Sequence, residues 1–454
     1  MSLKSINPFT VKVIEEFEEL SDSAIQKILA ESASAFEKWK KSDFNSREEL
    51  FNNTACILQD NKKALSLTIT REMGKPVTES EAEIDKCAWV CNYYAENGRN
   101  FLSDEPIETD AYKSYIRYEP LGTILGIMPW NFPFWQVFRF AMPALMAGNT
   151  VLLKHASNVQ GCAREIENVF NRSGFPPDVF RNLVIGSSKV DRIIQNDVVK
   201  GVSLTGSEIA GRNVGEIAGR NLKKSLLELG GSNAFVVLED ADIEKAAEIG
   251  VRARMMNAGQ SCIAAKRFIV HRKVSEKFID HFQHYLKKLK YGDPADYETN
   301  IGPLASVQQA MKVEEQVNIS VEMGARILTG GRRIKAFYEP SVLLDVSPGM
   351  PVFDEEVFGP VAPVIIAEDT DEAVILAGAT KFGLGVSLFT NDLDKAGELA
   401  LHFKDGAVFI NDLVKSDPRL PFGGTGRSGY GRELSIHGIR EFVNVKTVYE
   451  KKFQ

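Results

Sequence analysis

The spacing of apolar residues divides the first third of the chain into a helical part and a ribbon that leads into a sheet. Between residues 22 and 100, apolar positions recur every three or four residues with glutamate and lysine between them, which is typical of amphipathic helices. From about residue 112, tyrosine and isoleucine alternate with polar residues, and a short apolar segment follows that ends at Pro129. We therefore predict a helical N-terminal layer, then a ribbon and a buried strand.

Two series of alternating strands and helices follow along the chain. In the first, between residues 149 and 221, apolar runs such as TVLLKH and GVSLTG alternate with amphipathic segments. The second begins after the glycine-rich joint LGGSN and continues to about residue 391. Such alternation predicts α/β domains, with a doubly wound parallel sheet in the first. Because the chain of 454 residues exceeds the roughly 250 to 300 residues of a single core, we expect at least two large domains.

The charge balance and the lack of long apolar runs argue against two classes of protein, those that bind nucleic acid and those that span a membrane. The net charge of −7 offers no general attraction for a phosphate backbone, which argues against nucleic acid as a partner. No apolar run reaches the length of about 18 residues that spans a membrane, and the N-terminal segment lacks the apolar core of a signal peptide. We therefore expect a cytoplasmic protein that acts neither in a membrane nor on nucleic acid.

The five cysteines are odd in number and widely scattered, which argues against a disulfide framework. Cys87 and Cys91 share one face of a predicted helix, but no neighbouring histidine or cysteine completes a metal site, so packing in the core explains them. Cys262 differs because it follows a Gly-Gln-Ser turn in NAGQSCIAAKRF. A reactive thiol needs a group that takes its proton, and no histidine flanks Cys262, which disfavours a cysteine–histidine dyad.

Three further segments carry polar residues that suit catalysis or phosphate binding, and each also has a structural explanation. Glu228, in LELGGSN, is either a general base in an apolar setting or a structural residue at a strand end. Asn131, in PWNFP, either donates to an oxyanion or caps a turn. The turn Thr205-Gly206-Ser207 either binds a phosphate at a helix start or simply joins a strand to a helix, because its glycine spacing differs from the dinucleotide fingerprint.

Seven motifs resemble those of the NAD(P)-dependent aldehyde dehydrogenase superfamily and occur in the superfamily's order. They are PWNFP, LLKHAS, SLTGS, LELGGSN, GQSC, EEVFGP and PFGGTGRSGYGRE, and the resemblance covers nearly the whole chain. The segments PWNFPFWQVFR, LLKHASNVQGCA and AAKRFIV are most similar to the versions in the bacterial succinate-semialdehyde dehydrogenase branch. The resemblance implies an α/β fold with a Rossmann-like cofactor domain, an α/β catalytic domain and a β-arm for oligomerisation.

The resemblance also implies which residues carry the reaction. The Cys262 thiolate would attack the aldehyde to give a thiohemiacetal, whose oxyanion the Asn131 amide and the Cys262 backbone N–H would hold. After hydride transfer to the nicotinamide, Glu228 would activate the water that hydrolyses the acyl thioester. The other four cysteines match no motif, so we expect them to pack in the interior. No metal is implied.

For the cofactor, the resemblance implies NAD or NADP. Ser157 stands where NAD-preferring members often carry a glutamate that repels a 2′-phosphate, so we expect NADP to be accepted beside NAD. The alternative is that Ser157 is only a turn residue and that NAD stays preferred. Lys154 and Glu356 are matched to ribose hydroxyls, and Ser207 to the pyrophosphate. The full predicted set is Trp130, Lys154, Ser157, Gly206, Ser207, Glu356 and Phe358.

For the substrate, the resemblance implies a small aldehyde, most of all succinate semialdehyde. Arg139 aligns with an arginine that binds the distal carboxylate in this branch, and the alternative is a structural ion pair on its helix. Ser416 and Phe422 complete the predicted substrate site. A second arginine of the branch is replaced by Met256, and Arg254 lies two positions before it.

The predicted domain boundaries and alternatives follow from the same resemblance. Residues 1–105 and 121–228 are assigned to the cofactor domain, 229–427 to the catalytic domain, and 106–120 with 428–454 to the oligomerisation arm of a homodimer or homotetramer. One alternative is a broad-specificity or CoA-acylating aldehyde dehydrogenase, against which Glu228 and Arg139 argue. The other is a catalytically silent binding protein with the same fold, against which Cys262 argues.

Overall fold

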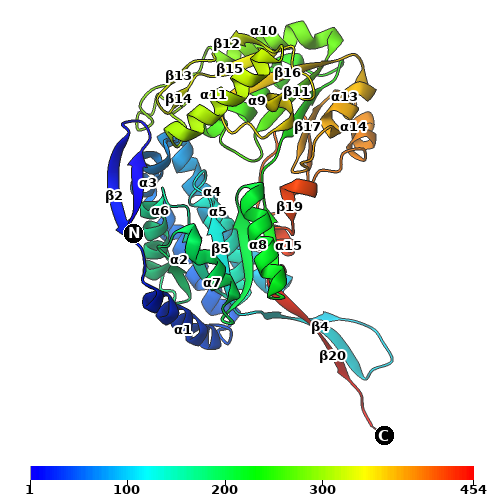
Figure 1. The fold of residues 1–454 in the computed structure, drawn as a ribbon. Coiled ribbons are helices and arrows are strands. Elements are labelled where there is room, and N and C mark those ends of the chain that lie inside the picture. Colours follow the sequence, from blue (N-terminus) through cyan, green and yellow to red (C-terminus); the bar gives the residue numbers. More distant parts are fainter. Residues whose placement is uncertain (1, 454) are drawn as a thin grey trace.

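Two mainly parallel sheets, of six and seven strands, organise the chain in the computed structural model, which describes residues 2–453. Figure 1 shows two bodies, one above the other, and a narrow ribbon that projects from the lower body and ends at the C-terminus. Strands alternate with helices in both bodies, which confirms the predicted α/β architecture. No helix within residues 2–453 is long and apolar enough to cross a membrane.

The six-stranded sheet lies in the lower body of Figure 1 and has the strand order β19-β9-β8-β5-β6-β7. Only the two-residue β19 runs antiparallel to its neighbour. The chain proceeds from β5 to β6 and β7 on one side and then to β8 and β9 on the other, so the topological switch point lies between β5 and β8. The strands span Thr123–Met128 (β5), Thr150–His155 (β6), Phe180–Asn182 (β7), Val199–Thr205 (β8), Lys224–Glu228 (β9) and Gly429–Tyr430 (β19).

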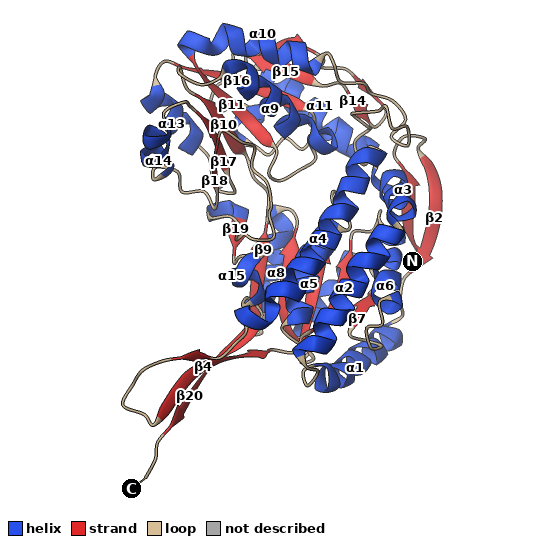
Figure 2. Cartoon of the chain, turned by 180° about the vertical axis from the view of Figure 1, so that it is seen from behind, coloured by secondary structure: helices blue, strands red, loops and turns tan. Residues whose placement is uncertain are grey.

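The helices of this body follow the predicted amphipathic segments. Ser21 and Ser207 accept hydrogen bonds from backbone N–H groups at the starts of α1 and α8, which fixes where these helices begin. α5 is buried along its whole length and packs against α4 and the sheet (Figure 2). The helices span Asp22–Trp39 (α1), Phe44–Asp60 (α2), Lys62–Met73 (α3), Val77–Phe101 (α4), Trp135–Met146 (α5), Gln160–Arg172 (α6), Val190–Gln195 (α7) and Glu208–Arg220 (α8).

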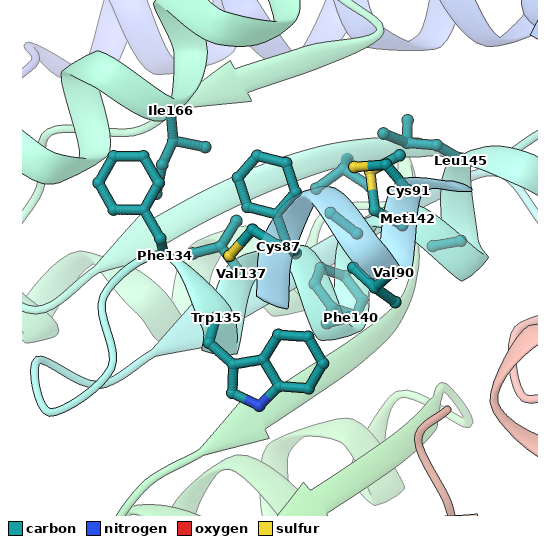
Figure 3. Packing of buried hydrophobic residues seen from close by; sticks show 14 of the residues in the cluster. Cys87, Val90, Cys91, Phe134, Trp135, Val137, Phe140, Met142, Leu145 and Ile166 are labelled. Carbon is teal, nitrogen blue, oxygen red and sulfur yellow. The ribbon is translucent and has the colours of Figure 1, made fainter. Parts of the chain in front are cut away.

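The cysteines outside the Gly-Gln-Ser turn take two different environments. Cys87 and Cys91 lie on α4 among apolar side chains of α5, as Figure 3 shows, and Cys162 is buried in the same core. The expectation that all four pack in the interior is wrong for Cys56, which is exposed on α2. Its neighbour Ala55 is buried, and one residue along a helix turns the side chain by roughly 100°, away from the core.

The seven-stranded sheet forms the second body, with the order β12-β15-β16-β11-β10-β17-β18 and only β12 antiparallel to its neighbour. Its strands span Asn233–Val237 (β10), Ala265–His271 (β11), Arg326–Thr329 (β12), Ser341–Leu344 (β15), Val361–Ala367 (β16), Val386–Phe389 (β17) and Val408–Ile410 (β18). The accompanying helices span Ile243–Met255 (α9), Ser275–Leu286 (α10), Val307–Glu322 (α11), Pro351–Asp354 (α12), Thr370–Gly378 (α13) and Leu393–Ala400 (α14). A small pair, Arg333–Ile334 (β13) and Phe337–Tyr338 (β14), lies beside α11.

The ribbon of Figure 1 is a three-stranded sheet with the order β20-β4-β3. Its strands span Glu105–Pro106 (β3), Lys113–Pro120 (β4) and Val443–Glu450 (β20), and β20 pairs with β4 along their full lengths. Val445 and Tyr449 are exposed on β20, which is an edge strand within the described chain. The assembly through this arm stays a prediction.

The structure adds short elements that the sequence analysis does not contain. An N-terminal hairpin of Ser2–Asn7 (β1) and Lys12–Glu18 (β2) packs beside α3 and α6. β19, within the segment assigned to the arm, instead pairs with β9 of the six-stranded sheet, and Ser435–Ile439 (α15) packs against α5. Short 3-10 turns span Ser187–Lys189 (η1), Met256–Gly259 (η2), Arg272–Val274 (η3) and Gly426–Ser428 (η4). The division into domains stays a prediction.

Candidate active site

A cavity of about 820 Å³ lies between α4 and α5 on one side and α9 with two long loops on the other. Cys262 lies in its wall, together with Arg139, Ser416 and Phe422, so the structure brings the predicted nucleophile and the predicted substrate residues to one cavity. The wall mixes apolar side chains, among them Phe132 and Trp135, with polar and charged ones. Such a mixed lining suits a small organic ligand that carries a polar or charged group.

The loop that carries Cys262 is held in an unusual backbone conformation. Asn257 and Ala258 have φ values of 52° and 51°, and Gly259 follows at 74°, so three consecutive residues are left-handed. A Cβ atom at Gly259 would lie 2.3 Å from the carbonyl oxygen of Gly359, so only glycine fits there. This contact presses the Cys262 loop against the segment that precedes β16.

A buried lysine fixes the other end of this loop. Lys266 donates hydrogen bonds of 2.8 Å to the carbonyl oxygens of Ser261 and Cys262, and its Nζ lies 3.3 Å from Oε1 of Glu356. Lys266 therefore places a positive charge beside the Cys262 backbone. The quoted stretch NAGQSCIAAKRF contains Lys266, but nothing in the sequence separates it from an ordinary basic residue.

Burial raises the pKa of the Cys262 thiol to about 11. The Arg139 and Lys266 cations act against this shift, whereas Glu356 and Glu228 reinforce it. At neutral pH the thiol is therefore mostly protonated, and forming the thiolate requires a proton acceptor.

Asn131 joins the PWNFP loop to the Cys262 loop. Its side-chain Nδ2 donates to the carbonyl oxygen of Gln260 at 3.1 Å, and Asn257 Nδ2 donates to the Asn131 carbonyl oxygen at 2.8 Å. An amide nitrogen carries two hydrogens, so the bond to Gln260 leaves Asn131 one hydrogen for a ligand. Asn131 is buried and lies outside the cavity lining that the described residues form.

Glu228 ends β9, opposite Thr205 on β8, and is also buried. Its Oε1 has no hydrogen-bond partner within residues 2–453, and a Cβ atom at Gly423 would lie 2.8 Å from this oxygen. Burial raises the pKa of Glu228 well above its ordinary value, and the charge of Glu433 adds to the rise, while Arg139 opposes it. A buried carboxyl group with a raised pKa suits proton transfer near neutral pH.

Arg139 links these groups rather than standing free in the cavity. It forms an ion pair with Glu433, and both side chains are 2% exposed. Its Nη2 donates to Thr205 Oγ1 at 3.3 Å, and its guanidinium lies 4.5 Å from the ring centre of Phe422. Arg139 therefore forms a structural ion pair, which is the alternative interpretation of this residue. Its partner Glu433 lies near β19 and not on the helix of Arg139. Carboxylate binding by Arg139 stays a prediction.

The predicted cofactor residues gather where the parallel strands end. The switch point between β5 and β8 is flanked by the PWNFP loop after β5 and by Gly206 and Ser207 after β8. Ser207 accepts a hydrogen bond from Ala210 N–H and so caps the N-terminus of α8. Backbone N–H groups at a helix N-terminus favour binding of an anion such as a phosphate. Lys154 lies near the end of β6 and is buried, and within residues 2–453 its side chain has no ion-pair or hydrogen-bond partner.

The remaining cofactor residues lie in two places. Trp130 and Phe358 pack edge to face, with ring centres 5.7 Å apart, so residues from the two bodies meet there. Glu356 accepts a hydrogen bond of 3.1 Å from Gly231 N–H, and a Cβ atom at Gly230 would collide with its carboxylate. Ser157 is exposed in the loop after β6. The buried Lys154 side chain and the N-terminus of α8 lie at the same edge of the six-stranded sheet. Together they suit a dinucleotide that carries phosphate groups.

Several residues that build the site are absent from the sequence-based set. Arg254 does not reach the cavity, because it is fully buried and donates to backbone carbonyl oxygens, among them that of Val357 at 2.9 Å. It thereby holds the segment that carries Glu356. Lys86 and Arg252 do line the cavity, on α4 and α9. Their helices look like ordinary solvated helices in the sequence, so only the fold identifies these residues.

Comparison with known proteins gives one consistent family. The family described as the aldehyde dehydrogenase family matches residues 1–448. The chain is 44% identical over 452 residues to a probable succinate-semialdehyde dehydrogenase (NADP+) of Synechocystis sp., a match that covers 99% of this chain and 100% of that protein. It is 45% identical over 455 residues to succinate-semialdehyde dehydrogenase (NADP+) 1 of Mycobacterium tuberculosis, with the same coverage.

Solved structures agree with these relatives. The succinic semialdehyde dehydrogenase of Streptococcus pyogenes, solved in complex with NADP+, superposes with a TM-score of 0.97 at 35% identity and covers 99% of this chain and 100% of that chain. The structure of Gox0499, solved for insight into cofactor and substrate selection, gives a TM-score of 0.97 at 38% identity, with 99% of each chain covered. These likenesses confirm the predicted fold.

Proposed function

The chain belongs to the aldehyde dehydrogenase family, and on that premise we propose that it oxidises succinate semialdehyde to succinate with NADP+ as the hydride acceptor. The observation that carries this proposal is the cavity that holds Cys262 together with cationic and hydroxyl side chains. A reactive thiol beside positive charge suits an aldehyde with a distal carboxylate. The names of the relatives from Synechocystis and Mycobacterium support the same substrate and cofactor.

The first step is proposed to form a bond between Cys262 Sγ and the aldehyde carbon. The thiol proton leaves with an acceptor such as the Glu228 carboxylate or water. The carbonyl electrons move to oxygen, which accepts the free hydrogen of Asn131 Nδ2 and the Cys262 backbone N–H. Hydrogen-bond donors at this oxygen would stabilise the negative charge as it develops.

The nicotinamide supplies the hydride acceptor when NADP+ is bound. On this chain, Lys154 and Glu356 are proposed to hold ribose hydroxyls, Gly206 and Ser207 the pyrophosphate, and Trp130 with Phe358 the nicotinamide side of the groove. Ser157, exposed and neutral, leaves room for a 2′-phosphate.

Hydrolysis of the Cys262 thioester is proposed to depend on Glu228. The carboxylate removes a proton from water while the water oxygen bonds to the acyl carbon, and the C–S bond then breaks to release succinate and the thiol. The raised pKa of Glu228 makes it a strong enough base for this step once it is ionised. This assignment favours water over coenzyme A as the acyl acceptor.

The experiment compares succinate semialdehyde with butanal, a neutral aldehyde of equal chain length, each with NADP+ and NAD+, by following the reduced nucleotide. We expect the highest kcat/KM with succinate semialdehyde and NADP+. Cys262→Ala should abolish turnover, whereas the matched control Cys56→Ala at an exposed position should keep it. An equal kcat/KM for both aldehydes would remove the substrate proposal and leave the family unchanged.

We further propose that this enzyme acts in the cytoplasm, that residues 1–105 and 121–228 bind the cofactor, and that residues 229–427 carry the catalytic cysteine. The arm of β4 and β20 is proposed to join a second copy of the chain, because exposed apolar residues lie on its edge strand. Sedimentation of the intact chain tests this last point, since a monomer at all concentrations would contradict it.

A further inference from the structure

We propose that Glu79, in the first turn of α4, is a positioning residue that holds the Cys262 loop in the conformation that aligns Asn131 with the reacting sulfur. Its neighbours Lys75 and Glu83 hold the PWNFP loop from the same end of α4. The inference rests on the proposed function, in which Asn131 stabilises an oxyanion formed at Cys262. Glu79 acts through the loop and takes no part in bond making or breaking.

The Glu79 side chain contacts the Cys262 loop where the backbone becomes left-handed. Its Oε2 accepts a hydrogen bond of 2.8 Å from the Asn257 N–H, and Asn257 has φ and ψ values of 52° and 37°. A left-handed backbone costs free energy at a residue other than glycine, so contacts from neighbouring elements must maintain it. The Glu79 carboxyl group supplies one such contact from α4.

Asn257 passes this constraint to both groups of the proposed oxyanion site. Its Nδ2 donates to the carbonyl oxygen of Asn131 at 2.8 Å and to that of Gln260 at 3.1 Å. Asn131 Nδ2 donates to the same Gln260 oxygen, and Gln260 lies two residues before Cys262. A chain of hydrogen bonds therefore leads from Glu79 to the proposed oxyanion donor and to the Cys262 loop.

A second carboxyl group of α4 fixes the PWNFP loop. Glu83 lies four residues after Glu79, so the two share one face of the helix. Glu83 Oε1 accepts hydrogen bonds of 2.8 and 2.9 Å from two backbone N–H groups at the start of α5. Lys75 forms a buried ion pair with Glu83, and its Nζ lies 3.7 Å from the ring centre of Phe132. The start of α4 therefore contacts both loops of the proposed oxyanion site.

Glu79 does not belong to a solvated helix face. It lies in the wall of the cavity that contains Cys262. Within residues 2–453 it forms no ion pair, and the bond from Asn257 is the one hydrogen bond of its side chain. Burial raises the pKa of Glu79 to about 7, the Lys75 cation and the Asn257 bond oppose the rise, and Glu83 adds to it. The partner of this carboxyl group is therefore the Cys262 loop.

The test measures the rate of NADPH formation in the first turnover, with saturating succinate semialdehyde and NADP+, and the KM for the aldehyde. In Glu79→Ala the Asn257 N–H loses its acceptor, so we expect the first-turnover rate to fall about 10- to 100-fold. KM should change less than about threefold, because an oxyanion donor acts on charge that develops after binding. Glu79→Gln keeps a side-chain oxygen that accepts this N–H, so its rate should stay within about threefold of wild type.

A double-mutant cycle separates positioning of Asn131 from a general effect on the fold. Asn131→Ala alone should lower the first-turnover rate about 100-fold or more. Adding Glu79→Ala to Asn131→Ala should lower it less than about threefold further, because the donor that Glu79 positions is already absent. An equal fold-change for Glu79→Ala in both backgrounds would contradict a role through Asn131.

The matched control is Glu81→Ala on the same helix. Glu81 accepts a hydrogen bond of 2.6 Å from Tyr297 Oη, which lies between α10 and α11, so the control also removes a contact between the two bodies. It leaves the Cys262 loop untouched, and its first-turnover rate should stay within about twofold of wild type. If Glu79→Ala melts at a lower temperature, Glu79→Gln and the double-mutant cycle, measured where all variants are folded, decide the matter.

Three outcomes overturn the inference, and they are distinguishable. If wild type oxidises succinate semialdehyde and Glu79→Ala keeps its first-turnover rate, the positioning role is wrong while the proposed function stands. If Glu79→Ala and Glu81→Ala slow the first turnover by the same factor, Glu79 only joins the two bodies. If wild type does not oxidise succinate semialdehyde, the proposed function fails, and the inference fails with it.

Discussion

His155 offers a test of how the six-stranded sheet supports the oxyanion loop. It ends β6, is fully buried, and its Nε2 lies 2.9 Å from the carbonyl oxygen of Pro133 in the PWNFP loop. Ala156 N–H donates to its Nδ1 at 2.9 Å. These contacts join the strand that carries Lys154 to the loop that carries Asn131.

Burial lowers the pKa of His155 from its ordinary value of 6.5 to about 4. Because the folded pKa lies below the unfolded one, the stabilising effect is present above about pH 6.5 and is lost as the pH falls toward 4. Integrating this shift gives a loss of about 2 kcal/mol in the free energy of unfolding between pH 7 and pH 5. The loss arises because the unfolded chain binds a proton that the buried ring excludes.

The assay is urea unfolding of wild type, His155→Gln and the control His284→Gln, at several values between pH 5 and pH 7. His284 is exposed on α10, so its replacement should leave the pH dependence unchanged. His155→Gln should remove about 2 kcal/mol of that dependence. The reasoning is refuted if wild type and His155→Gln lose equal stability on acidification, or if carbon-13 NMR shows His155 titrating near pH 6.5.

Two further predictions concern the site itself. Gly259→Ala places a Cβ atom 2.3 Å from the carbonyl oxygen of Gly359 at a φ of 74°, so kcat should fall about tenfold or more. The control Gly219→Ala lies in open space on α8 and should keep a kcat near that of wild type. Equal kcat values for the two variants would contradict the close approach at Gly259. Ser157→Glu should raise KM for NADP+ about tenfold or more by repulsion of a 2′-phosphate and spare NAD+, and an unchanged cofactor ratio in steady-state rates would disprove this.

Much of the fold can be predicted from the sequence because its core strands and helices are strongly patterned. β6 and β8 are short, largely buried segments with apolar residues at their centres, they lie between amphipathic helices, and both appear where expected. The β1 and β2 hairpin is missed because its strand Lys12–Glu18 is largely exposed and charged. β19 has two residues, too few for any period to show.

The site is only partly predictable, because several of its interacting residues lie far apart in the sequence. Cys262 and Glu228 belong to motifs, so the sequence suggests them. The partner of Arg139 is Glu433, and no local spacing reveals that the fold brings them together. α4 carries two basic residues, Lys86 and Arg99, and nothing in the local sequence shows that the loop of Ser416 folds against Lys86. Long-range packing, rather than local pattern, decides which charges are free to bind a ligand.

The central claim is that Cys262 forms an acyl thioester which Glu228 clears with water. The most direct measurement mixes Glu228→Gln with succinate semialdehyde and NADP+ and follows reduced nucleotide and intact protein mass together. The account predicts a single burst of about one nucleotide per chain, then near arrest, with a succinyl group on the peptide that contains Cys262. Continued turnover at the wild-type rate, or a succinyl group on any other residue, would contradict it.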